Sequence, residues 1–350
     1  LDLRPLVVEA AASADSGIAL AALRALGVLG TKEDWPRLAA IAQGKGAFSP
    51  ERSAAAALSL GGLGQGEAVV QSALQGLATE VVAQRVAAIA VFSELESSES
   101  VPLLATVLAA KGTRSERIAA AHALGRQAPT TPSALKALLA ASASGDAALR
   151  AGCVQAIALA ASRGLTSRLA YRKMLDLAKN KDERVRAAAI RAAAALDSVR
   201  FAKALKGISA GGSKLVLESI GEVLGALPGE VALGRLLELS TVSDPGMRQA
   251  AAMGLAKRRD PKSAEALSVL LADSSAPVRL AALAGLTSED ELRPFLEDED
   301  PSLQAAALRG LVAAMGAEAA APLVAGKLAT SGDVLGSQLL WVGAWLTAER

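Results

Sequence analysis

The sequence predicts an all-α protein built as an α-solenoid, in which helical hairpins repeat along one chain. The 350 residues are 52% hydrophobic but only 2% aromatic, so the apolar content is mainly Ala, Leu and Val, which suit closely packed helices. One helical pattern recurs at steps of 31 to 36 residues, with a last step of 25. Turn signals such as Gly112, Gly145, Asp260 and Pro261 separate the copies, and no alternating β pattern competes with them.

The clearest copy of the pattern is KDERVRAAAIRAAAAL, residues 181–196. Asp182 precedes the helix and can accept hydrogen bonds from the free amide groups of its first turn, and Arg186 lies one turn inside. Small and apolar residues follow at helical spacing and form one packing face: Val185, Ala189, Ala192 and Ala193.

The repeat frame is defined by the position of Arg186, with small residues three and six positions later and an apolar anchor at seven. It begins again at Ala19, Glu51, Arg85, Arg117, Arg150, Leu217, Arg248, Arg279 and Gln304. Its anchors are Leu26, Leu58, Phe92, Leu124, Ile157, Ala193, Leu224, Leu255, Leu286 and Leu311. The short last step predicts a trimmed repeat around residues 289–299.

A second amphipathic run precedes each of these helices. Examples are 35–42, 69–77, 101–108, 134–141, 169–178, 231–239 and 264–271. Each unit is therefore predicted to be a helical hairpin. One hairpin cannot bury both sides of its apolar stripe, so neighbouring hairpins must stack.

The segments DERVRAAAIRAAAAL, DPGMRQAAAMGLAKRRDP, APVRLAALAGL and SERIAAAHALG resemble HEAT repeats, in particular the short phycobilisome-lyase-type variety. The resemblance covers residues 1–350 and implies a right-handed superhelix of about eleven HEAT-like hairpins. We expect a single domain with an irregular short repeat near 287–311 and a terminal repeat at 316–350. Such repeats serve scaffolds, adaptors, transport factors and a few enzymes, so the resemblance specifies a fold more closely than a function.

Acidic and basic residues recur at constant positions relative to the frame position, and we call them the Asp/Arg ladder. Its candidate acids lie four residues before the frame position: Asp15, Asp146, Asp182, Asp244 and Asp300. Its candidate bases lie at the frame position itself: Arg150, Arg186, Arg248 and Arg279. We expect the acids to cap their helices and each Arg to meet an Asp or a loop carbonyl of its own or the neighbouring repeat. This structural role is favoured over ligand contact.

Groups for catalysis are scarce. His122 and Cys153 are the only residues of their kinds and lie in different repeats, so the usual zinc sites and Cys-His pairs cannot form. No EF-hand loop or phosphate-binding loop is present, and the glycines between 61 and 66 are interpreted as a hairpin connection. The sequence therefore predicts a protein that is not an enzyme and needs no metal or cofactor.

A protein or peptide partner is the favoured ligand. Residues five positions after the frame lie off the packing stripe, and in the resembled family this face lines the concave surface. The polar members of this column, with Arg184 beside them, are the candidate contacts: Arg24, His122, Gln155, Arg184, Arg191, Glu222 and Arg309. The other interpretation is a solvated helix face.

Charge is balanced overall, with a net value of +2, but is uneven along the chain. Residues 163–206 hold twelve bases and four acids, whereas seven acids lie between 289 and 300. The basic stretch raises the alternative of phosphate binding to nucleic acid, which the scarcity of aromatic residues disfavours. The resemblance raises a bilin lyase-like subunit as a further alternative, with no support beyond the repeat itself.

The C-terminal end carries Trp341 and Trp345, four residues apart on one expected helix face. They either pack inward or form a docking surface, including one for self-association. No apolar run reaches the roughly 20 residues that span a bilayer, so we expect a soluble protein. The chain begins at Leu1 without Met, which is consistent with a removed leader and with either a cytoplasmic or an exported protein.

Overall fold

The computed structural model describes residues 3–45, 49–95, 97–109, 112–205, 213–258 and 260–330. Within these ranges the backbone forms helices and turns and contains no β-strand. The chain divides by its contacts into two compact units, Leu1–Asp197 and Ser198–Arg350, and consecutive helices pack in series within each. The predicted all-α solenoid fold is therefore confirmed.

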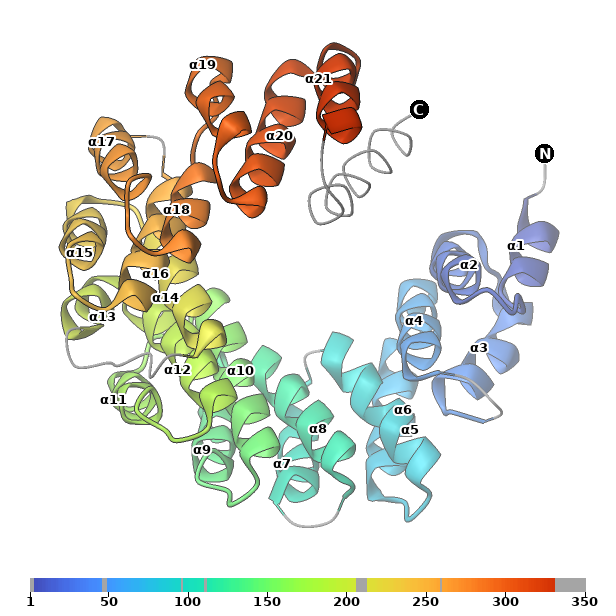
Figure 1. Cartoon of the computed structure of the whole chain (residues 1–350). Coiled ribbons are helices and arrows are strands. Elements are labelled where there is room, and N and C mark those ends of the chain that lie inside the picture. The colour runs from blue at the N-terminus through green and yellow to red at the C-terminus, as the bar shows by residue number, and fades with distance from the viewer. Residues whose placement is uncertain are drawn as a thin grey trace. The chain divides into compact units, whose positions relative to one another are not determined.

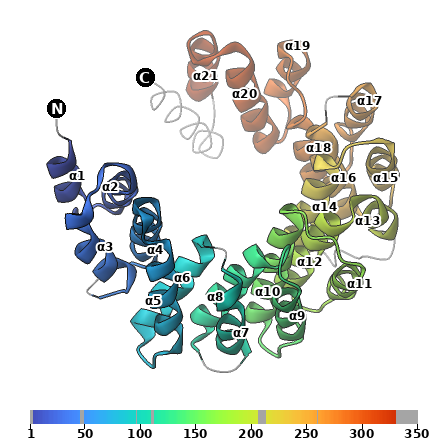
Figure 2. The same cartoon turned by 180° about the vertical axis from the view of Figure 1, so that it is seen from behind.

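The first unit consists of six helical hairpins that stack side by side. Their first helices are α1 (Arg4–Ala10), α3 (Trp35–Ala42), α5 (Gly66–Ala78), α7 (Val101–Ala109), α9 (Pro132–Ala141) and α11 (Arg168–Leu177). Their second helices are α2 (Ser16–Leu29), α4 (Pro50–Leu60), α6 (Val82–Glu94), α8 (Arg114–Gln127), α10 (Ala147–Ser162) and α12 (Glu183–Leu196). The second helices contact one another in order and form one row. The first helices α5, α7, α9 and α11 lie in a separate row beside it (Figures 1 and 2).

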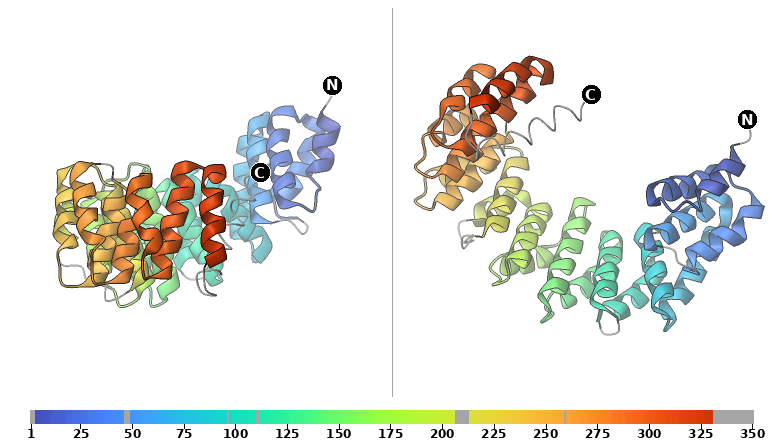
Figure 3. Two further views of the ribbon diagram at one scale, coloured as in Figure 1. Left: turned by 45° about the horizontal axis from the view of Figure 1, so that its top comes forward. Right: turned by 45° about the vertical axis from the view of Figure 1, so that its right-hand side comes forward.

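The second unit repeats this arrangement. Its elements are α13 (Ser198–Ala204), α14 (Lys214–Ala226), α15 (Glu230–Ser240), α16 (Pro245–Ala256), α17 (Pro261–Leu270), α18 (Ala276–Leu283), α19 (Glu289–Leu292), α20 (Pro301–Met315) and α21 (Ala317–Thr330). Here α14, α16, α18 and α20 contact one another in order, and the hairpins lie side by side (Figure 3). The first helix before α20 is reduced to the four residues of α19 and a 3₁₀ turn over Arg293–Glu297.

The domain organisation stays a prediction. Stacked repeats contact only their neighbours, so they divide into compact units with or without a domain boundary between them. A single domain over 1–350 and a right-handed superhelix therefore remain expectations. The terminal repeat predicted at 316–350 begins with α21, and its residues 331–350 lie outside the described part of the chain.

The second repeat begins two residues later than predicted. Leu58, the expected anchor, is 37% exposed, whereas Leu60 is 4% exposed. Ala56, expected in the outward column, is 0% exposed. When Ser53 is taken as the frame position, Leu60 becomes the buried anchor and Leu58 the outward fifth residue. The prediction that the frame starts at Glu51 was therefore wrong.

The glycines between 61 and 66 connect two hairpins and do not lie inside one. A turn of π-helix at Gly61–Gln65 follows α4 and leads directly into α5. Gly64 has a φ of 83°, in the left-handed region that residues with a side chain rarely adopt. A glycine at this position lets the chain leave one repeat and enter the next through a five-residue turn.

Consecutive second helices approach each other closely at one recurring contact. The residue eight positions after the frame residue of one repeat meets the residue six positions after the frame residue of the next repeat. A Cβ atom on Gly125 would lie 2.5 Å from the carbonyl oxygen of Ala156, and one on Gly225 would lie 2.7 Å from that of Gly254. At the corresponding contact between α2 and α4, a Cβ atom on Gly27 would lie 3.1 Å from the Cα of Ser59. The backbones themselves are therefore in contact, which only small residues permit.

Replacing Gly125 with Ala should destabilise the first unit by about 1–3 kcal/mol, because the new methyl group overlaps the backbone of α10. The control is Gly234→Ala in α15, where a Cβ would meet nothing within 4 Å. That change should stabilise by about 0.5–1 kcal/mol through helix propensity alone. Urea unfolding followed by circular dichroism compares the two variants, and an unchanged midpoint for Gly125→Ala would contradict the close contact.

Candidate protein-binding surface

The candidate contact residues of the first unit lie on the row of second helices. Arg24 on α2, His122 on α8, Gln155 on α10 and Arg191 on α12 share the fifth frame position. Arg24 and Gln155 are exposed, and His122 and Arg191 are half-buried. The exposed Leu58 of α4 takes the same position after the frame correction. This row therefore presents charged, amide, imidazole and apolar groups on successive helices.

In the second unit the same frame position is held by Glu222 on α14 and Arg309 on α20, and both are exposed. The intervening members are the half-buried Met253 and the exposed Ala284. A small residue and a flexible thioether leave room for an approaching chain between the two charged ends. Each unit thus carries its own short row of candidate contacts.

An ion pair joins neighbouring helices beside His122. Arg126, one helical turn after His122 on α8, lies 3.5 Å from Glu94 on α6. Both side chains are partly exposed, so the pair contributes little to stability. The pair lies on the row of second helices, so it adds one positive and one negative group to the candidate surface.

Neither His122 nor Cys153 is arranged for catalysis. Burial lowers the pKa of His122, so its imidazole is neutral at pH 7 and offers one donor and one acceptor. Burial raises the pKa of the Cys153 thiol to about 12, which keeps it protonated and unreactive. Among the described residues, no three His, Cys, Asp or Glu side chains are grouped so that they could hold a metal ion.

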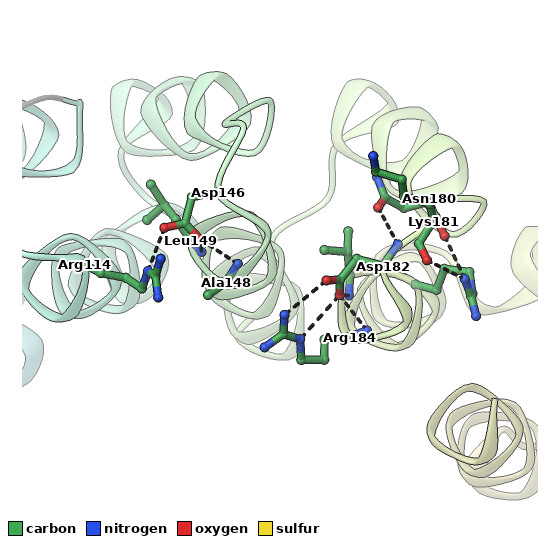
Figure 4. A network of polar contacts seen from close by, with 10 residues as sticks. Arg114, Asp146, Ala148, Leu149, Asn180, Lys181, Asp182 and Arg184 are labelled. Carbon is green, nitrogen blue, oxygen red and sulfur yellow. Dashed lines mark hydrogen bonds and ion pairs between the residues drawn. The ribbon is translucent and has the colours of Figure 1, made fainter.

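Arg184 is engaged within its own helix turn. Its Nη2 lies 3.1 Å from Oδ2 of Asp182, and the other carboxylate oxygen of Asp182 accepts from the main-chain N–H groups of Arg184 and Val185 (Figure 4). The Arg184 side chain is 60% exposed, so it remains accessible while it is paired. The prediction placed Arg184 among the binding residues, and the structure gives it a local partner as well.

The predicted capping aspartates all accept main-chain hydrogen bonds in the first turn of their helices. They are Asp15, Asp146, Asp182, Asp244 and Asp300. Asp146 also accepts from Nε of Arg114 on the preceding repeat at 2.7 Å (Figure 4). The hydrogen bond from Arg114 is the main cause that lowers the pKa of Asp146. Asp146 therefore joins two repeats as well as capping one helix.

The frame residue of most repeats donates to the main-chain carbonyl six residues earlier, in the turn before its helix. Nη1 of Arg186 lies 3.0 Å from the Asn180 oxygen, and Nη1 of Arg279 lies 2.9 Å from that of Asp273. The same bond joins Arg85 to Thr79, Arg150 to Ser144, Arg248 to Val242 and, through an amide, Gln304 to Asp298. In these six repeats the frame side chain thus closes the turn of its own hairpin.

Two frame arginines also reach an acid of the following repeat. Arg248 forms a bidentate pair with Asp273, with Nε to Oδ2 at 2.6 Å and Nη2 to Oδ1 at 2.9 Å. Arg85 Nε lies 3.1 Å from Oε1 of Glu116. Burial acts to raise the pKa of Glu116, but bonds from Thr113 and Arg85 outweigh it and hold the pKa below its usual value. These acids were not predicted, because they lie at unequal distances from the frame.

The Arg248–Asp273 pair should make stability depend on pH. The hydrogen bond from Arg248 lowers the pKa of Asp273, so the pair stabilises the fold above the ordinary Asp pKa and is lost as pH falls through the lowered value. Asp273→Asn keeps a side chain able to cap but removes the charge, and should cost about 1–3 kcal/mol at pH 7. Urea unfolding should show this difference shrinking below about pH 4.

The control for this prediction is Asp290→Asn. Asp290 is an exposed acid of the same unit with no hydrogen-bond or ion-pair partner among the described residues. Its replacement should leave the unfolding free energy within about 0.5 kcal/mol of the wild type at every pH. A cost for Asp273→Asn that persists unchanged at pH 3 would show that lost packing, and not charge, is responsible.

The described residues of the basic stretch 163–206 lie on several elements. A group of cations lies on α11 and the turn that follows, and their charged groups have no partner among the described residues: Arg168, Arg172, Lys173, Lys179 and Lys181. Leu169 beside them is 68% exposed. Arg191 lies on α12 in the row of second helices, whereas α13 with Arg200 belongs to the second unit.

Two predictions concern the ends and solubility of the chain. Trp341 and Trp345 lie outside the described residues, so the terminal docking surface stays a prediction. In the part of the chain that the structure describes, none of the helices combines the length and apolar character that a membrane crossing requires.

Comparison with known proteins identifies the repeats. Residues 208–287 match the family described as HEAT repeats. This segment therefore carries HEAT repeats. The finer resemblance to the phycobilisome-lyase type stays a prediction, and no curated protein matches the sequence.

Several solved structures are similar to this chain. A crystal structure of importin beta matches with a TM-score of 0.53 and 15% identity, over 97% of this chain and 55% of its own. The karyopherin Kap121p, bound to the extreme C-terminus of the protein phosphatase Cdc14p, gives a TM-score of 0.46 and 15% identity, over 97% of this chain and 45% of its own. A crystal structure of an engineered protein gives a TM-score of 0.37 and 18% identity, over 99% of both chains. At such identities the importin beta match shows the fold alone, and this chain spans about half the length of the importin beta and Kap121p chains.

Proposed function

We propose that this HEAT-repeat protein is a non-enzymatic scaffold or adaptor that binds a protein partner along its second helices. The observation that carries the proposal is the row of accessible side chains at the fifth frame position. In the first unit, Gln155 is exposed and His122 and Arg191 are half-buried on three successive helices. Stacked repeats offer a long surface on which many modest contacts add up.

The chemistry of this row suits hydrogen bonding to another chain. The neutral His122 and the amide of Gln155 can each donate and accept, and Arg191 adds a planar donor fork. Leu58 adds an exposed apolar contact on α4. The thiol of Cys153 is buried, and the described residues offer no metal-ligand cluster, so the same surface provides little for covalent or metal chemistry.

The test is the double variant Gln155→Glu with Arg191→Glu, used as bait in a pull-down from the native source followed by quantitative mass spectrometry. Recovery of a partner of the second-helix row should fall at least about tenfold, because Gln155→Glu adds a negative charge and Arg191→Glu reverses a positive one on the contact surface. The melting temperature should stay within about 2 °C of the wild type, since both changes lie off the packing stripe.

The matched control is Arg172→Glu, an exposed charge reversal on α11 of the same unit. Recovery of the partner by this variant should equal that of the wild type. Equal recovery by the Gln155 and Arg191 double variant would contradict the proposal, and loss of folding in that variant would assign Arg191 a structural role.

Phosphate binding by the cations of α11 is the second candidate function. Five unpaired bases and the exposed Leu169 on and beside one helix favour it. Retention on DNA or RNA should then fall steeply as salt rises, and Arg172→Glu should weaken it while the Gln155 and Arg191 variant does not. Absence of retention at 50 mM salt would eliminate this alternative.

A further inference from the structure

A groove lies between the first helices α3 and α5, apart from the candidate surface on the second helices. Its cavity volume is about 550 Å³, within the range of ligand-binding clefts. The floor is apolar and comes from α4, α5 and α6, through Leu60, Val69, Ala73, Ala88 and Val91. Small residues on α3 and α5, such as Ala39, Ala42 and Gly76, keep the groove open.

The rim of the groove is rich in side-chain amides. Gln43, Gln65, Gln75 and Gln84 all line it, and no side-chain amide of these four has a hydrogen-bond partner among the described residues. Each amide offers two donors and an acceptor. Trp35 borders the same groove and adds an aromatic ring to its wall, while its indole nitrogen is shielded from solvent. Donors and acceptors that lack a protein partner therefore line one cavity.

The charge of the groove is nearly neutral. Of the described residues that line it, Lys45 is the single charged one, and none carries a carboxylate. A phosphate-rich ligand such as a nucleic acid would find one cation, whereas a neutral amide polymer would find donors and acceptors in the same place. A carboxylate at one end of such a polymer would complement Lys45.

We propose that this groove binds an extended segment of another protein through its main chain. A peptide backbone alternates N–H donors and carbonyl acceptors, which matches the paired capacity of the glutamine amides. Side chains of an extended segment point alternately to opposite faces, so every second one meets the apolar floor. The eight residues of α3 span about 12 Å, which accommodates about four extended residues.

The segment that fits best has small apolar side chains toward Val69 and Ala73 and an acidic side chain that reaches Lys45. This inference is independent of the proposed function, because the groove and the second-helix row use different residues.

The test is selection of a phage-displayed random octapeptide library on the full chain, followed by affinity measurement of the enriched peptides by fluorescence anisotropy. Gln75→Leu combined with Gln84→Leu should weaken the enriched peptides about tenfold or more, because two amides lose their hydrogen bonds. Gln71→Leu is the matched control, since Gln71 is an exposed glutamine of α5 that does not line the groove. Ala68→Trp, at an exposed lining position, should block binding.

Two further measurements test whether the groove recognises the main chain of the peptide and whether the second-helix row takes part. Methylation of the main-chain nitrogens of an enriched peptide should reduce binding about tenfold or more, because it removes donors and leaves the side chains unchanged. The Gln155 and Arg191 double variant should bind the same peptide as the wild type. Failure to enrich any sequence, equal affinity for the Gln75 and Gln84 variant, or full tolerance of N-methylation would each overturn the proposal.

Discussion

The fold depends on the close approach of successive second helices. Where Gly125 faces Ala156 and Gly225 faces Gly254, there is no space for another methyl group between the two backbones. Helices this close exclude large side chains from the contact itself, so the anchors at position seven, such as Leu124 and Leu255, point into the core between the two rows. The scarcity of aromatic residues and the abundance of Ala and Gly follow from this geometry.

Much of the fold could be predicted because the close contact recurs with the period of the repeat. The run predicted at 35–42 coincides with α3, and the other predicted first helices agree with the structure within a few residues. The predicted frame position of the second repeat was wrong for a physical reason. Ala54 to Ala57 form a uniform run in which several frames are equally acceptable, and only the packing of Leu60 selects one.

The polar contacts could be predicted only where they are local. Caps such as Asp182 lie at a constant distance before their helices, and sequence spacing therefore finds them. The acids that join repeats lie at different places, Glu116 one residue before its frame position and Asp273 six before, so no periodic signal marks them. The glutamine groove also lacks a period, although five glutamines between residues 43 and 84 were a compositional signal.

The bond that six frame side chains make to the turn of their own hairpin has a consequence for how such a chain can change over time. Because Arg186 and Arg279 close their turns without help from another repeat, a whole hairpin carries its own means of holding its two helices in register. Turns of three, four and five residues, before α6, α16 and α12, all keep this bond. Arg117 differs in its acceptor, since its guanidinium donates to the carbonyl of Leu108 nine residues earlier. Duplication or loss of a complete hairpin carries the bond along with it, so the number of repeats in such a chain can change without loss of this contact.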